Sequence, residues 1–144
     1  MQDERRSFRH PRTSSPTQDI IGKLPPSNTD AERAVLGAIL LHDAGISQIS
    51  DFLCAEDFYV LAHQMIYQAM LAIAQRTQRI DLVTLQDELS KKEQLDSVGG
   101  LSYLVSLQED IPAAGLIEQH ARIIKEKSVL RELISSAMNI IAKC

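Results

Sequence analysis

The sequence predicts an all-α fold, and three observations support this prediction. The chain has 144 residues, of which 44% are hydrophobic but only 4% aromatic, so we expect a core built mainly from aliphatic side chains. Apolar residues recur at spacings of three and four along several segments. Glycine and proline fall mostly near the start of the chain and between those segments. We therefore expect a compact bundle of about five helices followed by one long projecting helix.

Residues 1–23 differ in composition from the rest of the chain. They are polar and show no periodicity, which predicts a disordered tail. Five cationic and three anionic side chains give the tail +2, and because the whole chain carries −4, residues 24–144 carry −6. An acidic domain is a poor surface for duplex DNA, since phosphate contacts require lysine and arginine. A solvated tail is a simpler interpretation than nucleic-acid binding. Its charged residues are Asp3, Glu4, Arg5, Arg6, Arg9, Arg12, Asp19 and Lys23.

The segment after the tail predicts two helices. Asn28 or Thr29 can cap the first helix, and Thr29-x-x-Glu32 fits the capping-box pattern. Residues 34–41 are apolar on nearly all sides, which indicates a buried helix. We expect Gly45 to end this unit. A short second helix then follows, marked by Ile46, Ile49, Phe52 and Leu53.

Residues 55–76 predict a loop and a third helix. Phe58 and Tyr59 supply two aromatic anchors in the loop, and the acidic pair Glu56-Asp57 is typical of a helix N-terminus. The helix over residues 61–76 carries an apolar stripe suited to core packing, made of Ala62, Met65, Ile66, Ala69, Met70 and Ile73.

Residues 80–104 predict two helices joined by a tight turn. Asp81 or Thr84 can cap the first helix, and Thr84-x-x-Asp87 fits the capping-box pattern. Gly99-Gly100 permits the turn because glycine has no Cβ. The first helix has an apolar face, Leu82, Leu85 and Leu89, opposite a polar face, Gln86, Asp87, Glu88, Lys91 and Lys92.

The last segment, residues 113–144, predicts one long helix after the compact unit of residues 24–112, which ends at Ile111-Pro112. At about 1.5 Å per residue this helix would be ~40 Å long, too long for the compact unit to cover. From about Leu130 we expect it to project into solvent with a stripe free to bind a partner. The stripe follows Leu116, His120, Ile123, Leu130, Ile134, Ala137 and Ile141, widened by Ile117, Ile124 and Leu133. The candidate partner-binding residues are Ile123, Leu130, Leu133, Ile134 and Ile141.

The sequence offers no catalytic, cofactor-binding or metal-binding site. A nucleotide-driven motor needs the phosphate-binding motif G-x-x-x-x-G-K-[ST], and the one Gly-Lys pair, Gly22-Lys23, is followed by leucine. The cysteines and histidines lack metal-ligand spacing. Cys54 is most simply a small buried hydrophobe and His63 a packed histidine. Two cysteines and no run of about 18 apolar residues predict a cytoplasmic protein without a membrane span.

Four groups of residues, in order, resemble one known domain. They are A-E-R-A-V-L-G at 31–37, D-F-Y and H-Q-x-I-Y within 57–67, D-L-V-T-L and Q-L-D-S-V-G-G within 81–100, and R-I-I-K-E-K and R-E-L-I within 122–134. Together, residues 24–134 resemble the N-terminal domain of DnaB-type bacterial replicative helicases. Each motif alone is weak, and their order makes the resemblance specific.

The resemblance implies a role in protein–protein interaction. Domains of this family pair through helical hairpins into the collar of a hexameric helicase and bind the C-terminal domain of primase. ATP, Mg²⁺ and most DNA contacts belong to a separate motor domain, and a helicase loader is a further implied partner. Residues 113–144 would be the first arm of such a hairpin, and we expect the chain to be a fragment truncated before the second arm.

Two other classes of protein stay open as alternatives. One is a free-standing α-helical adaptor or helicase loader without a motor domain. The gene sequence beyond Cys144 would separate it from the helicase, because a linker followed by a P-loop would identify the latter. The other is a small thiol or metal enzyme, which metal analysis and the thiol reactivity of Cys54 would test.

Overall fold

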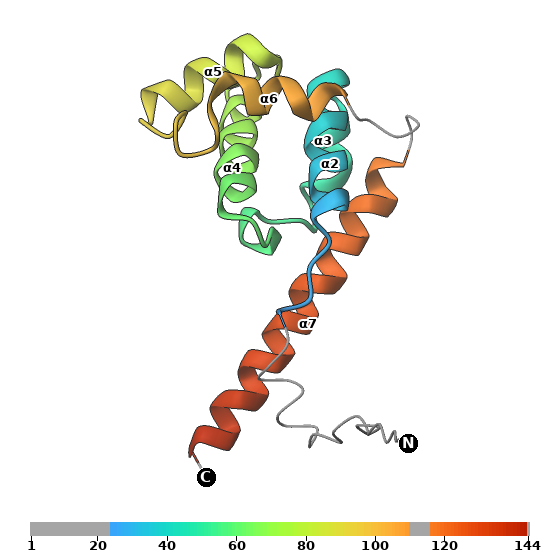
Figure 1. The fold of residues 1–144 in the computed structure, drawn as a ribbon. Helices are drawn as coiled ribbons and strands as arrows, with labels where there is room; N and C mark the ends of the chain where they lie inside the picture. Colours follow the sequence, from blue (N-terminus) through green and yellow to red (C-terminus); the bar gives the residue numbers. More distant parts are fainter. Residues whose placement is uncertain (1–23, 110–115, 144) are drawn as a thin grey trace, which may run out of the picture.

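The structure is a computed structural model that describes residues 24–109 and 116–143. These residues contain six α-helices, one short 3₁₀ helix and no β-strand, which confirms the predicted all-α class. Figure 1 shows a body of packed helices and one long helix that runs past it. The predicted disordered tail and the predicted helix end at Ile111-Pro112 lie outside the described residues. The elements are α2 (Thr29–Leu41), α3 (Gly45–Ile49), η1 (Ala55–Asp57, 3₁₀), α4 (Leu61–Gln75), α5 (Leu82–Lys91), α6 (Gly100–Glu109) and α7 (Ile117–Lys143).

Helix α2 begins after Asn28, one of the two predicted caps. The side-chain oxygen of Asn28 accepts a hydrogen bond from the backbone N–H of Ala31 at 3.0 Å. The predicted capping box of Thr29 and Glu32 is wrong. The Glu32 side chain turns into the body instead, where it is 1% exposed, because donors from distant segments meet its carboxylate there.

Gly45 begins a helix rather than ending a unit. Helix α3 starts at Gly45 and stops at Ile49, so the prediction that its helix reaches Phe52 and Leu53 is also wrong. A Cβ on Gly45 would lie 3.0 Å from Cδ1 of Ile117, and α3 and α7 therefore approach closely at this point.

The joint between α5 and α6 has the predicted geometry. Asp81 caps α5: its carboxylate accepts from the N–H of Thr84, and the Thr84 hydroxyl oxygen accepts from the N–H of Asp81, both at 2.9 Å. The hydrogen bond from the Thr84 backbone lowers the pKa of the Asp81 carboxyl. The capping box therefore pairs Asp81 with Thr84, and the predicted pairing of Thr84 with Asp87 is wrong. Gly99 and Gly100 have φ angles of 109° and 73°, which favour glycine.

The predicted polar face of α5 is wrong at Glu88, which is buried. Its carboxylate pairs with Arg76 at 2.6 Å and with Lys92 at 3.5 Å. The hydrogen bond from Arg76 is the main reason that the pKa of Glu88 is lowered. Leu85 and Leu89 are fully buried on the same helix, as the apolar spacing predicts.

The core of the body is mainly aliphatic, as the composition predicts. Tyr67 is its largest buried side chain, and its hydroxyl donates to the carbonyl of Leu53 at 3.0 Å. Burial raises the pKa of Tyr67. The largest fully buried side chains are Tyr67, Phe58, Leu36, Ile39, Ile49, Leu53, Ile66, Met70, Ile73, Leu85, Leu89 and Leu104.

Helix α7 is one continuous element of 27 residues. Figure 1 shows its N-terminal part against the body and its C-terminal part extending beyond it. Ile117, Ala121, Ile124 and Ser128 are its buried residues, and nothing from Val129 to Lys143 is buried. The body therefore covers about the first half of the helix.

Candidate interaction surface on helix α7

Helix α7 carries apolar side chains on two different faces. Ile117, Ala121 and Ile124 face α2 and α3 at i, i+4 and i+7, one side of a helix. At about 100° per residue, Leu130 and Leu133 fall on the opposite side. The single stripe predicted from Leu116 onward is therefore wrong for the docked half, because it treated Ile117 and Ile124 as marginal and left out Ala121. Those three residues are the buried apolar residues by which α7 contacts the body.

The structure places the five predicted partner-binding residues unequally. Leu130, Leu133 and Ile141 are 43%, 60% and 58% exposed, and Ile134 is half-buried. Ile123 is partly buried against the core of the body, which separates it from the other four. We call Leu130, Leu133, Ile134 and Ile141 the projecting stripe.

A polar cluster fixes the point at which α7 leaves the body. The carboxylate of Asp57, in η1, accepts hydrogen bonds from the Ser128 hydroxyl at 2.7 Å and from Lys125 Nζ at 3.2 Å. It also accepts from the backbone N–H of Cys54 at 2.8 Å. These donors satisfy a carboxylate that is almost fully buried. We call Asp57, Lys125, Ser128 and Arg131 the latch.

Arg131 extends the latch by one helical turn. Its guanidinium donates to the carbonyl of Pro26 at 2.7 Å and to the carbonyl of Asp57 at 2.6 Å. The guanidinium carbon also lies 5.5 Å from the centre of the Tyr59 ring. Arg131 thus ties α7 both to η1 and to the segment that leads into α2, at the position where the projecting stripe begins.

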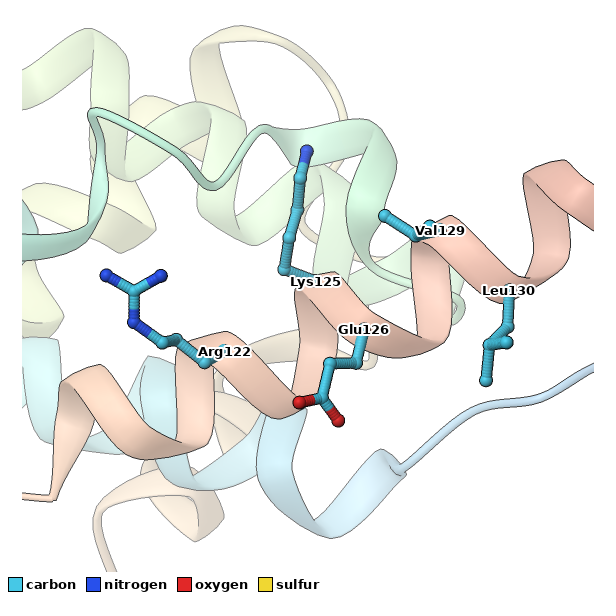
Figure 2. Close-up of a pocket in the computed structure, with 5 residues that line it drawn as sticks. All are labelled: Arg122, Lys125, Glu126, Val129 and Leu130. Carbon is cyan, nitrogen blue, oxygen red and sulfur yellow. The ribbon is translucent and has the colours of Figure 1, made fainter.

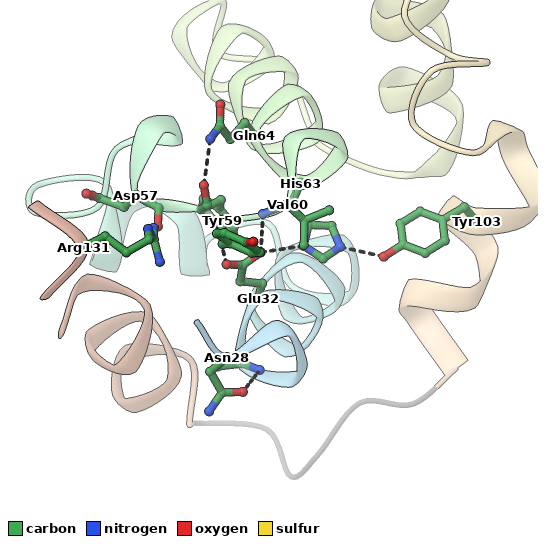
Figure 3. A network of polar contacts seen from close by, with 11 residues as sticks. Asn28, Glu32, Asp57, Tyr59, Val60, His63, Gln64, Tyr103 and Arg131 are labelled. Atoms are coloured by element: carbon green, nitrogen blue, oxygen red, sulfur yellow. Dashed lines mark hydrogen bonds and ion pairs between the residues drawn. The ribbon is translucent and has the colours of Figure 1, made fainter. Parts of the chain in front are cut away.

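A second buried network holds the chain after η1 against α2. The Glu32 carboxylate accepts from the N–H of Tyr59 at 2.7 Å and from the N–H of Val60 at 3.3 Å. It also lies 2.7 Å from Nδ1 of His63, whose Nε2 lies 2.5 Å from the Tyr103 hydroxyl (Figure 3). The network joins α2, α4 and α6, and His63 is a packed residue within it, as predicted.

Sequence reasoning missed the roles of Glu32 and Asp57. Glu32 was assigned to a local cap, but its partners lie up to 31 residues away. Asp57 does cap η1 locally, as predicted, through the N–H of Cys54, but its carboxylate also accepts from Ser128, 71 residues away. One sequence signal was available for Glu32. Val35 and Ile39 follow Glu32 at i+3 and i+7, which places Glu32 on the apolar side of its helix. A carboxylate buried there requires hydrogen-bond donors.

An open groove of about 500 Å³ lies along α7 beside the projecting stripe. Figure 2 shows Arg122 and Lys125 directed to one side of the helix and Glu126 and Leu130 to the other. Arg122 is held in place, because its guanidinium carbon lies 4.4 Å from the Phe52 ring centre. Interface cores are depleted of lysine and glutamate, so the apolar contact that this groove offers comes from Val129 and Leu130. The lining residues are Arg122, Lys125, Glu126, Val129 and Leu130.

The described part of the chain also bears on the predictions about metal ligands, a membrane span and Cys54. Within residues 24–109 and 116–143, no three His, Cys, Asp or Glu side chains gather as metal ligands. Over the same ranges, no helix has the length and apolar character needed to cross a membrane. Cys54 is exposed, so its prediction as a small buried hydrophobe is wrong, and Leu53 takes the core position instead.

Comparison with known proteins identifies the family. A model of the DnaB-like helicase N terminal domain matches residues 24–126. The chain is 48% identical over 118 residues to the replicative DNA helicase DnaB of Geobacillus stearothermophilus, and 46% identical over 118 residues to the replicative DNA helicase DnaC of Bacillus subtilis. Each match covers 82% of this chain and 26% of the relative, so the chain spans about a quarter of the length of these curated relatives.

Two solved structures share the fold. The N-terminal domain of DnaB helicase from Mycobacterium tuberculosis superposes with a TM-score of 0.80 at 34% identity, covering 83% of this chain and 86% of the other. A DnaB-like replicative helicase, solved in a study of its interactions with primase, gives a TM-score of 0.72 at 30% identity, covering 81% of this chain and 27% of the other. The chain belongs to the family of DnaB-like helicase N-terminal domains.

Proposed function

We propose that this chain is the N-terminal collar domain of a hexameric replicative DNA helicase, where it mediates subunit assembly and primase binding. In this role ATP and Mg²⁺ act in a separate motor domain, and the protein works in the cytoplasm. Two facts support the proposal: the chain belongs to the DnaB N-terminal family, and it matches about a quarter of the length of replicative helicases.

The projecting stripe carries the assembly part of the proposal. Four large apolar side chains stand on the part of α7 that extends beyond the body. Covering such a side chain contributes about 1.5–3 kcal/mol, so the stripe favours burial against another helix. We assign that place to a second copy of this domain. The latch sets the direction in which α7 leaves the body and so presents the stripe.

Primase binding has a different kind of support. It comes from the solved DnaB-like replicative helicase whose description includes its interactions with primase. No single residue of this chain identifies a primase contact, so the test must use the whole domain.

Calorimetric titration tests the primase assignment. The C-terminal domain of a primase is titrated into the full chain. We expect a saturable heat and co-elution of the two proteins as one complex. A primase fragment without its C-terminal domain is the control and should give only heat of dilution. The absence of both a saturable heat and co-elution would contradict the assignment.

A further inference from the structure

The segment that leads into α2 runs along α7. Arg131 of α7 holds the carbonyl of Pro26 at 2.7 Å. Figure 1 shows this segment following α7 from the body toward the C-terminal part of the helix. Leu24, the first described residue, is 87% exposed at the far end of the segment. The described segment therefore ends, at Leu24, beside the part of α7 where the projecting stripe begins.

The edge of α7 that continues from Arg131 is less exposed than its surroundings. Ile134 and Met138 follow Arg131 at i+3 and i+7, which places all three on one edge of the helix. Ile134 and Met138 are half-buried, whereas the neighbouring Leu133 is 60% exposed. Leu130, one turn before Ile134, points to the side of α7 on which the segment before α2 runs (Figure 2).

Residues 1–23 contain one apolar pair suited to this edge. Ile20 and Ile21 are the only branched aliphatic residues of the tail. Six residues separate Ile20 from Pro26, a reach of about 20 Å when extended. The distance along α7 from Arg131 to Ile141 is about 15 Å, so the pair can reach the whole projecting stripe. The pair also precedes residue 24, where the match to the family model begins.

We propose that Ile20, Ile21 and Leu24 dock on the Arg131–Ile134–Met138 edge of α7 in the same chain and cover part of the projecting stripe. The anchor at Pro26 keeps the tail beside the helix at a high effective concentration, so this contact forms before contact with a second molecule. The tail then competes with a second copy for Leu130 and Ile134. The projecting stripe would therefore bind the tail of its own chain as well as a second copy, an intramolecular contact that goes beyond the proposed function.

Methyl NMR tests the contact directly. Spectra are recorded on the full chain at a concentration where light scattering gives a monomer. The double variant Ile20→Ser, Ile21→Ser should shift the methyl resonances of Ile134 and Met138. Deletion of residues 1–23 should shift the same resonances. Phe8→Ser changes an apolar residue of the same tail and should leave those resonances in place. The exposed Leu101 methyls on α6 provide an internal control for a change in the body.

Self-association provides a second readout. If the tail covers the stripe about nine-tenths of the time, both copies must release it before they pair, so removing its apolar pair should tighten the apparent dimerisation constant about a hundredfold. Unchanged Ile134 and Met138 resonances after deletion of residues 1–23 would overturn the proposal. Weaker self-association of the deleted chain would also overturn it, because the tail would then be part of the interface between copies. The NMR result does not require dimerisation and so distinguishes this proposal from the proposed collar function.

Discussion

The projecting half of helix α7, from Val129, is richer in apolar residues than the docked half, yet only the docked half is covered by the body. The first half places two isoleucines and an alanine against the body and adds the latch at its end, whereas the second half exposes larger apolar side chains. Apolar content therefore does not decide which half docks. Small residues that allow close approach, together with polar residues that find buried partners, decide it.

The largest expected effect tests this contrast with two substitutions on the same helix. Ile124 is 1% exposed in the docked half and Leu133 is 60% exposed in the projecting half. Ile124→Ala should lower the free energy of unfolding by about 3 kcal/mol, because it leaves a cavity in the core. Leu133→Ala should change it by less than about 0.5 kcal/mol. Urea denaturation of dilute, monomeric protein measures both, and equal losses would contradict the contrast.

A smaller effect is expected at the latch. Asp57→Ala removes the acceptor of the Ser128 hydroxyl and Lys125 ammonium and should cost about 2 kcal/mol. Asp87→Ala is the matched control, because Asp87 forms an exposed pair with Lys91 and should cost less than about 0.5 kcal/mol. Urea denaturation gives the values, and hydrogen exchange should show faster opening near Ser128 in the Asp57 variant. Unchanged exchange there would show that the latch does not hold α7.

The smallest effect is the loss of folding stability at acid pH, which should come from a carboxylate in the body rather than from one on the projecting half of α7. The pKa of Glu88 is lowered from its ordinary 4.5, chiefly by its hydrogen bond to Arg76. Its stabilising contribution is therefore complete above the unfolded pKa and is lost as the pH falls through the lowered folded pKa. Glu88→Gln should reduce the loss of stability below about pH 4.5, whereas Glu132→Gln on the projecting half should not. The urea midpoint against pH measures this, and identical profiles for all three proteins would refute it.

Local signals made part of the fold predictable. The Asp81 cap and the Gly99-Gly100 joint depend on residues within a few positions, and the structure contains both. Leu85 and Leu89 are buried because a helical period places them on one face. These elements needed no knowledge of distant segments.

Side chains whose partners are distant in sequence could not be assigned in this way. The local pattern indicates a helix cap at Glu32, but its carboxylate is buried and contacts His63. The local pattern indicates a solvated face at Glu88, but its carboxylate is buried and pairs with Arg76. On α7 the spacing identified the apolar residues but not the face that docks on the body. Ser128 lies on the docked face, but an apolar pattern does not include it because it contributes through a hydrogen bond to Asp57. The projecting residues were predictable from length alone, since the body is shorter than the helix.

Light scattering on the full chain tests the central claim, that the projecting stripe is an assembly face. We expect the average mass to rise with concentration. Leu130→Glu combined with Ile134→Glu should abolish this rise while the circular dichroism of the helices is kept, because charge on the stripe opposes its burial.

The matched control is Val83→Glu combined with Leu101→Glu, which places the same charges on exposed apolar positions of α5 and α6 and should leave self-association unchanged. A strictly monomeric parent chain at high concentration, with α7 fully formed, would contradict the claim. Equal loss of self-association in both double variants would contradict it as well.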